Sequence, residues 1–129
     1  MSDMASAYAV TRISPSEAHA KMKDEAYTYI DVRSSLELAS GRPAGAVNVP
    51  LTNDEDAFVD AVERSFAKDA KLIIGCQTGI RSLRAARLLL AAGFTNVLEQ
   101  RAGFDAARGP FGEVKEPGWS RAGLPVEID

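Results

Sequence analysis

Short apolar runs alternate with helical patterns along this chain, and the alternation limits the folds that it can adopt. Helical spacing is predicted in a segment that begins after Ser14 and at residues 57–66 and 81–92, with a short helix near residues 36–38. The apolar runs, which are typical of buried strands, lie at residues 10–13, 27–32, 46–49, 72–74 and 97–98. Strands that alternate with helices at this spacing predict an α/β fold, with a mainly parallel central sheet flanked by helices on both faces.

Two of the predicted helices carry clear boundary signals. Ser14, Pro15 and Glu17 supply an N-cap, a proline in the first turn and the glutamate of a capping box. Gly93 follows the third helix in the usual C-terminal position. These local signals support the predicted order of elements.

The length of 129 residues is that of one ordinary domain, so a single domain over residues 1–129 is expected. Residues 1–9 are expected to be a flexible N-terminus. Residues 108–120 are rich in glycine and proline and are predicted to be an irregular loop insertion.

Composition narrows the possible partners. A net charge of −3 argues against a nucleic-acid-binding or anionic-membrane surface, which would need a concentrated basic face. The first fourteen residues contain no continuous apolar run, so no secretory signal is expected and the protein is predicted to be cytoplasmic. One cysteine excludes an internal disulfide, and His19, interpreted as solvated, leaves no closed zinc set, so neither metal nor cofactor is expected.

The segment most informative about chemistry runs from Lys71 to Leu83, where a strand leads through the loop from Cys76 to Arg81 into a helix. Ligands of parallel α/β sheets bind beyond the carboxyl ends of the strands, where this loop is expected. Backbone N–H groups of a tight loop before a helix form a concave site that favours an anion, and Gly79 permits the turn.

Cys76 is interpreted as a nucleophile and not as a small core residue. Its neighbours Gly75, Gln77 and Thr78 are not apolar, and it ends a strand instead of lying within one. The thiolate is the reactive form, and a helix terminus alone contributes typically under ~1 kcal/mol to its stability. Several N–H donors and the Arg81 guanidinium are therefore expected to act together on the sulfur.

Four motifs occur in order: IDVR from Ile30 with Glu37, GRPAGAVNVP from Gly41, CQTGIRS from Cys76, and AGLPVE from Ala122. Together they resemble the successive motifs of the rhodanese family of single-domain sulfurtransferases, over nearly the whole chain. The resemblance implies a rhodanese-like fold and a catalytic Cys76. It also implies that the transferred sulfur is held by the substrate-binding residues of the loop, which are Gln77, Thr78, Gly79, Ile80 and Arg81.

The resemblance further implies structural support around the loop. Asp31 and Arg33 belong to this support, with Arg33 and Glu37 expected to form an ion pair. Arg42 stands where the family often has a histidine, and Ser82 directly follows the loop. Both are included among the supporting residues.

Loop length separates this chain from related cysteine enzymes. Phosphatases that share the rhodanese fold have five residues between the cysteine and the arginine, because a larger loop must surround a tetrahedral phosphate. Four residues separate Cys76 from Arg81, so a phosphatase or an arsenate reductase is the weaker alternative. A nucleotide-binding P-loop is not indicated either, since no lysine precedes Ser82.

The predicted activity is transfer of sulfane sulfur from thiosulfate or a similar donor, through a persulfide on Cys76, to a thiol or cyanide. The expected partners are a small-molecule sulfur donor and a thiol acceptor. A protein that accepts the sulfur is a further candidate partner. Two alternatives remain open: a sulfur carrier that serves one dedicated partner protein, and a regulatory binding module. Retention of Cys76 and Arg81 favours catalysis over a pure binding module.

Overall fold

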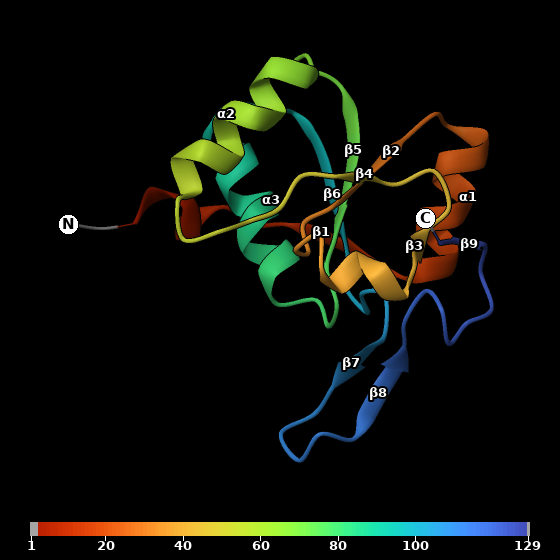
Figure 1. Ribbon diagram of the computed structural model, residues 1–129. Helices are drawn as coiled ribbons and strands as arrows, with labels where there is room; N and C mark the ends of the chain where they lie inside the picture. The colour runs from red at the N-terminus through yellow and green to blue at the C-terminus, as the bar shows by residue number, and fades with distance from the viewer. Residues whose placement is uncertain (1–2, 129) are drawn as a thin grey trace.

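A parallel sheet forms the centre of the computed structural model, which describes residues 3–128 (Figure 1). Its five strands lie in the order β1, β6, β5, β2, β4, and every neighbouring pair is parallel. The predicted α/β fold with a mainly parallel sheet is therefore confirmed. The strands of this sheet are β1 (Thr11–Ile13), β2 (Thr28–Asp31), β4 (Val47–Asn48), β5 (Lys71–Gly75) and β6 (Asn96–Gln100).

Helices cover both faces of the sheet, as the sequence predicts (Figure 1). One face carries the first helix, and the opposite face carries the other two. The predicted capping box is present: the Ser14 hydroxyl accepts from Glu17 N at 3.1 Å, and the Glu17 carboxylate accepts from Ser14 N at 3.0 Å. The helices are α1 (Pro15–Asp24), α2 (Glu55–Ser65) and α3 (Arg81–Ala91).

Alternation along β5 builds a core on each side of the sheet. Ile73 packs with Ala18 of α1, whereas Leu72 and Ile74 belong to the core that α2 and α3 cover, together with Leu89. All five residues are fully buried. Because both faces of β5 are apolar, the strand is held centrally and ends in a defined place, where the loop at Cys76 begins.

The N-terminal segment differs from the flexible one that the sequence predicts. Residues Met4–Ala7 form a 3-10 helix, η1, which lies against α3. Ala5 is buried, and Asp3 forms an ion pair with Arg84 of α3 at 2.6 Å. A local cap and one charge pair thus order residues 3–7, while residues 1 and 2 lie outside the described part of the chain.

The predicted loop insertion at residues 108–120 is largely a β-hairpin. Strands β7 (Ala106–Arg108) and β8 (Val114–Pro117) pair antiparallel and project from the carboxyl end of the sheet (Figure 1). Glycine is needed at the turn, where Gly112 has φ +79°, and Pro117 lies on an edge strand, where its missing N–H is tolerated. The glycines and prolines that indicated an irregular loop therefore lie mainly in the tight turn of the hairpin and on an edge strand.

Three smaller elements complete the described chain. The 3-10 helix η2 (Glu37–Ser40) leads into β3 (Arg42–Pro43), which pairs antiparallel with β9 (Val126–Glu127) near the C-terminus. No helix within residues 3–128 is long and apolar enough to cross a membrane.

Candidate active site

Cys76 lies at the carboxyl end of the sheet, between the last residue of β5 and the start of α3. Its Sγ accepts hydrogen bonds from the backbone N–H of Gly79, at 3.2 Å, and of Ser82, at 3.3 Å. The residue is only 1% exposed, so these donors act where little water competes. Because N–H donors favour negative charge on sulfur, the loop is arranged to stabilise a thiolate.

The loop backbone packs directly against the segment that follows β6. Phe104 N donates to the carbonyl of Cys76 at 2.8 Å, and Asp105 N donates to the carbonyl of Gln77 at 3.1 Å. Gly103 approaches so closely that a Cβ atom built on it would lie 2.3 Å from Gln77 O. Only glycine fits this contact, which fixes the height of the loop above the sheet.

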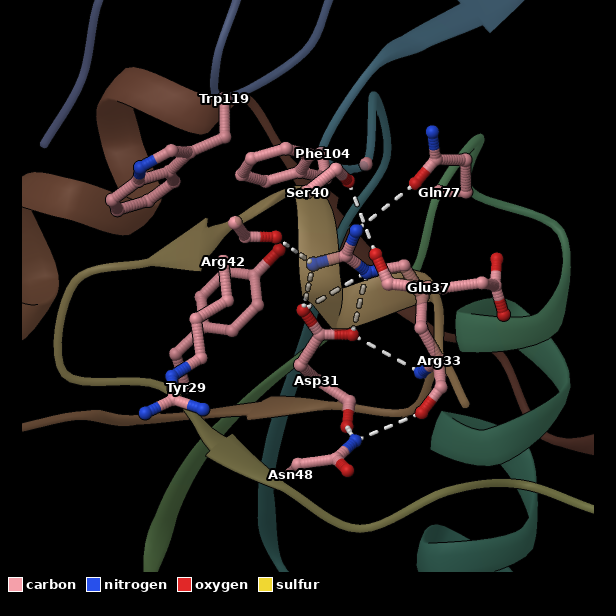
Figure 2. A network of polar contacts seen from close by, with 12 residues as sticks. Tyr29, Asp31, Arg33, Glu37, Ser40, Arg42, Asn48, Gln77, Phe104 and Trp119 are labelled. Carbon is pink, nitrogen blue, oxygen red and sulfur yellow. Dashed lines mark hydrogen bonds and ion pairs between the residues drawn. The ribbon is translucent and has the colours of Figure 1, made fainter. Parts of the chain in front are cut away.

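A buried polar network supports the loop from the side of β2 (Figure 2). Arg33 is fully buried and binds the carboxylate of Asp31, with Nη2 to Oδ2 at 2.7 Å and Nε to Oδ1 at 3.0 Å. Its Nη1 donates to Gln77 Oε1 at 3.1 Å, and its Nη2 donates to Gly41 O at 2.9 Å. Asn48 Nδ2 donates to the carbonyls of residues 31 and 33 at 2.9 and 2.8 Å. This geometry links Asp31 and Arg33 to the loop through one side chain of the loop.

The ion pair expected between Arg33 and Glu37 is not formed. Glu37 instead binds Arg81 through two hydrogen bonds of 2.7 and 2.8 Å. The Arg81 guanidinium lowers the pKa of Glu37 to about 2, and the carboxylate in turn raises the pKa of Arg81. Arg33 points inward to Asp31, so Glu37 faces the arginine that closes the loop. The last loop residue is thereby tied to η2.

The remaining predicted residues have different surroundings. Thr78, Gly79 and Ile80 line a cavity of about 500 Å³ beside the loop, and Ile80 is 76% exposed. Arg42 lies in β3, where its Nε is 3.6 Å from Oε1 of Glu127. The structure therefore brings the loop residues together and places Arg42 in contact with the C-terminal strand.

That cavity has a second wall, which β1, the segment after β6 and the hairpin form. Arg12 of β1 and Arg101, which follows β6, line it, and the base of the hairpin closes the far side with Arg108. Each guanidinium is paired with a carboxylate, on Glu99, Glu116 and Asp105 respectively. The hairpin thus borders the active-site loop on the side of β1 and β6.

Two charged residues near the sulfur escaped the sequence analysis. Glu99 of β6 is fully buried and accepts a short hydrogen bond from the hydroxyl of Ser82. Arg12 donates to Glu99 Oε1 at 2.6 Å and to the carbonyl of Gly79 at 2.7 Å. The available signal was a carboxylate directly after the apolar pair Val97 and Leu98, because such a group is rarely buried without a specific partner.

Comparisons with known proteins agree with this geometry. A family model described as the rhodanese-like domain matches residues 14–108. "Thiosulfate sulfurtransferase 16, chloroplastic" of Arabidopsis thaliana is 33% identical over 108 residues, which are 78% of this chain and 80% of the relative. "Thiosulfate sulfurtransferase GlpE" of Glaesserella parasuis is 29% identical, over 92% of this chain and 94% of its own. A crystal structure of an M. tuberculosis protein shares the fold, with a TM-score of 0.76, 24% identity, and coverage of 95% and 100%.

Proposed function

The chain belongs to the rhodanese-like domain family, and from this premise we propose that it is a sulfurtransferase that carries sulfane sulfur as a persulfide on Cys76. The observation that supports this most directly is the pair of N–H groups, of Gly79 and Ser82, directed at Cys76 Sγ. Donors in this arrangement stabilise an anionic sulfur nucleophile without a buried counter-ion in contact with it.

The proposed reaction has two halves. In the first, the Cys76 thiolate attacks the outer sulfur of thiosulfate, a bond forms between the two sulfur atoms, and sulfite leaves with the electron pair of the broken S–S bond. In the second, the thiolate of an acceptor attacks the outer sulfur of the persulfide, and the Cys76 thiolate is released. Cyanide accepts the same sulfur atom as thiocyanate. Each half-reaction conserves atoms and charge, and ping-pong kinetics follow.

The loop residues take separate parts in this proposal. The N–H groups of residues 77–81 surround the outer sulfur and offset its negative charge. Arg81 closes the loop through its ion pair with Glu37, and Gln77 links the loop to Arg33. The loop has four residues between Cys76 and Arg81, which suits one sulfur atom better than a tetrahedral phosphate or arsenate.

A protein acceptor is the second candidate for the last step. Leu36 and Ile80 are 83% and 76% exposed, and the residues that follow them, Glu37 and Arg81, form the ion pair at the edge of the loop. Two exposed apolar side chains beside the loop are suited to contact with a partner surface. This observation supports a protein partner at the loop, and the N–H donors at Cys76 Sγ favour a sulfur carrier over a binding module that does no chemistry. The cytoplasmic location stays a prediction, since one relative is named as chloroplastic.

Intact-mass measurement tests the proposal. The protein is treated with thiosulfate, desalted and weighed, and then treated with a thiol and weighed again. We expect a gain of one sulfur atom followed by its loss, and no gain in Cys76→Ser, which keeps the loop backbone but lacks the thiol. Because the chain has one cysteine, any persulfide is assigned without mapping. A wild-type protein that gains no sulfur from thiosulfate, polysulfide or a low-molecular-weight persulfide would contradict the proposal. Phosphatase activity, measured in parallel, would then support the phosphatase alternative.

A further inference from the structure

Five residues around the sulfur form a closed ring of polar contacts, which we call the polar ring. Cys76 Sγ lies 3.2 Å from the hydroxyl of Ser82, and that hydroxyl is bonded to Glu99 Oε2. Arg12 then connects Glu99, at 2.6 Å, to the carbonyl of Gly79, at 2.7 Å. The ring closes where Gly79 N donates to Cys76 Sγ at 3.2 Å. A carboxylate is therefore connected to the reactive sulfur through one hydroxyl.

The contacts of the polar ring are buried or partly buried, so solvent screens them less than it screens a surface ion pair. Cys76 is 1% exposed, Ser82 and Glu99 are 0% exposed, and the side chain of Arg12 is 37% exposed. A carboxylate removed from water is unfavourable unless hydrogen bonds and a cation compensate it. Glu99 has both, through Ser82 and Arg12. Because little water screens its charge, the carboxylate acts strongly on the groups that it contacts.

The Ser82 hydroxyl has one proton and two neighbours that can accept it. The shorter contact and the stronger acceptor are both on the side of Glu99, so the hydroxyl proton points to the carboxylate when Glu99 is ionised. The hydroxyl oxygen then offers a lone pair to Cys76, and the thiol S–H is the donor in that contact. A continuous proton path thus runs from sulfur through oxygen to the carboxylate.

The charge balance of the ring favours transfer of the thiol proton along this path over its release to water. If Cys76 lost its proton to bulk water, a thiolate and a carboxylate would share one buried site with a single arginine. If the proton passes to the carboxylate instead, the ring keeps one negative charge and one positive charge. We propose that Glu99 accepts the thiol proton of Cys76 through Ser82, an inference that rests on the proposed role of Cys76 as sulfur carrier.

The proton transfer balances within the ring. The S–H proton of Cys76 moves to the oxygen of Ser82 as the original hydroxyl proton moves to Glu99 Oε2. The products are a thiolate, a serine hydroxyl that now donates to it, and a neutral carboxylic acid. Glu99 acts on sulfur only through Ser82 and is in this sense a positioning residue.

Other ionisable groups that face the ring keep their charge during this transfer. Tyr29 of β2 stays neutral, because burial raises its pKa far above the ordinary value. Asp31 forms an ion pair with Arg33. Arg81, at the start of α3, forms an ion pair with Glu37, which lowers the pKa of Glu37 and raises the pKa of Arg81. Tyr29, Glu37 and Arg81 therefore do not titrate between about pH 6 and about pH 9.

The thiolate can be measured directly by its ultraviolet absorbance, with Cys76→Ser subtracted as the reference. In the wild type we expect the fraction of Cys76 present as thiolate to change by no more than about twofold from pH 8 to pH 6, because the transfer releases no proton to water. The Glu99→Gln side chain has nearly the shape of glutamate, and its amide oxygen can accept a hydrogen bond from the Ser82 hydroxyl, but it cannot take up a proton. The thiolate of this variant is expected to fall about tenfold per pH unit over the acidic part of the same range.

Matched variants separate the proton path from general damage. Ser82→Ala is expected to behave as Glu99→Gln does, and Ser82→Thr, which restores a hydroxyl, is expected to recover the wild-type profile. Glu116→Gln removes the carboxylate of another arginine pair, outside the ring, and is expected to leave the profile unchanged. A wild-type profile that already falls tenfold per unit, identical profiles for wild type and Glu99→Gln, or more thiolate at neutral pH in Glu99→Gln than in wild type would each overturn the proposal.

These measurements need no sulfur donor. If the wild type gains sulfur in the intact-mass experiment but shows no pH-independent thiolate, the proton path is wrong and the sulfurtransferase proposal stands. If the thiolate profile is as expected and no donor loads Cys76, the sulfurtransferase proposal is wrong. The two failures are therefore distinguishable.

Discussion

The ion pair between Glu37 and Arg81 ties the end of the active-site loop to η2, and Glu37→Gln removes its charge with little change of shape. The carboxylate oxygens accept two hydrogen bonds from Arg81, at 2.7 and 2.8 Å, and Oε1 also accepts from Ser34 N at 3.0 Å. Glutamine keeps one acceptor oxygen for Ser34 but loses the charge and the two-point contact. The substitution therefore measures what the ion pair contributes to stability.

The magnitude follows from the pKa of Glu37, which Arg81 lowers from 4.5 to about 2. A shift of that size corresponds to about 3.4 kcal/mol at about 1.36 kcal/mol per unit. Because the side chains of Glu37 and Arg81 are 32% and 40% exposed, solvent screens the pair, and we expect only about 1 kcal/mol. The folded-state pKa lies below the unfolded-state value, so this stability is complete above about pH 4.5 and is lost as the pH falls toward about 2.

Urea unfolding of wild type and Glu37→Gln at a series of pH values checks this expectation. The difference in unfolding free energy should be about 1 kcal/mol at neutral pH and should shrink steadily below about pH 4.5. Glu63→Gln breaks the more exposed pair with Lys68 and serves as the control, with an expected change of no more than about 0.5 kcal/mol. A difference that is absent at neutral pH, or that persists undiminished near pH 2, would refute the reasoning.

Two further substitutions, with one control, test the packing around the loop and beside it. Gly103→Ala places a Cβ against Gln77 O in a residue with φ +69°, so we expect the unfolding free energy to fall by more than about 2 kcal/mol and sulfur loading to become slower. Gly112→Ala is the control, because Gly112 has φ +79° but open space around it. It should lower the unfolding free energy by only about 1–2 kcal/mol and leave sulfur loading unchanged. Equal effects of the two in urea unfolding and intact-mass assays would show that the close contact does not matter. Trp119→Ala should lower the unfolding free energy by about 3–5 kcal/mol, because the ring is fully buried and its Nε1 donates to Pro125 O at 2.7 Å. A loss under about 1 kcal/mol in thermal unfolding would mean that the C-terminal segment is not part of the core.

Local signals in the sequence were enough to predict the main elements and the position of the candidate nucleophile. The strand before Cys76, the helix that begins at Arg81 and the glycine that ends it each follow from a few neighbouring residues. A parallel sheet then brings the carboxyl ends of its strands to one edge. The place of the loop at that edge could therefore be predicted without knowing any long-range contact.

Side-chain partners were harder to predict, because they depend on which way each chain segment faces. Glu37 has Arg33 four residues away, yet it pairs with Arg81, 44 residues away. Arg33 is turned inward by Asp31 and by the carbonyl of Gly41. The contact of Arg12 with Glu99 spans 87 residues, and no spacing rule connects the two. The hairpin was missed for a related reason, since its register depends on pairing and its turn residues resemble those of an irregular loop.

The anchors of the loop attach to its backbone and flanking side chains on several sides. Phe104 N binds the carbonyl of Cys76, Arg33 binds Gln77, and Arg12 binds the carbonyl of Gly79. None of these three contacts passes through the sulfur atom, so sulfur can gain and lose a second atom while they remain intact. Buried charges such as Arg33 are costly and add little net stability, but they restrict the loop to one arrangement. In the proposed reaction, a loop held in this way keeps its N–H donors in place for both the thiolate and the persulfide, which avoids reorganisation during each half-reaction.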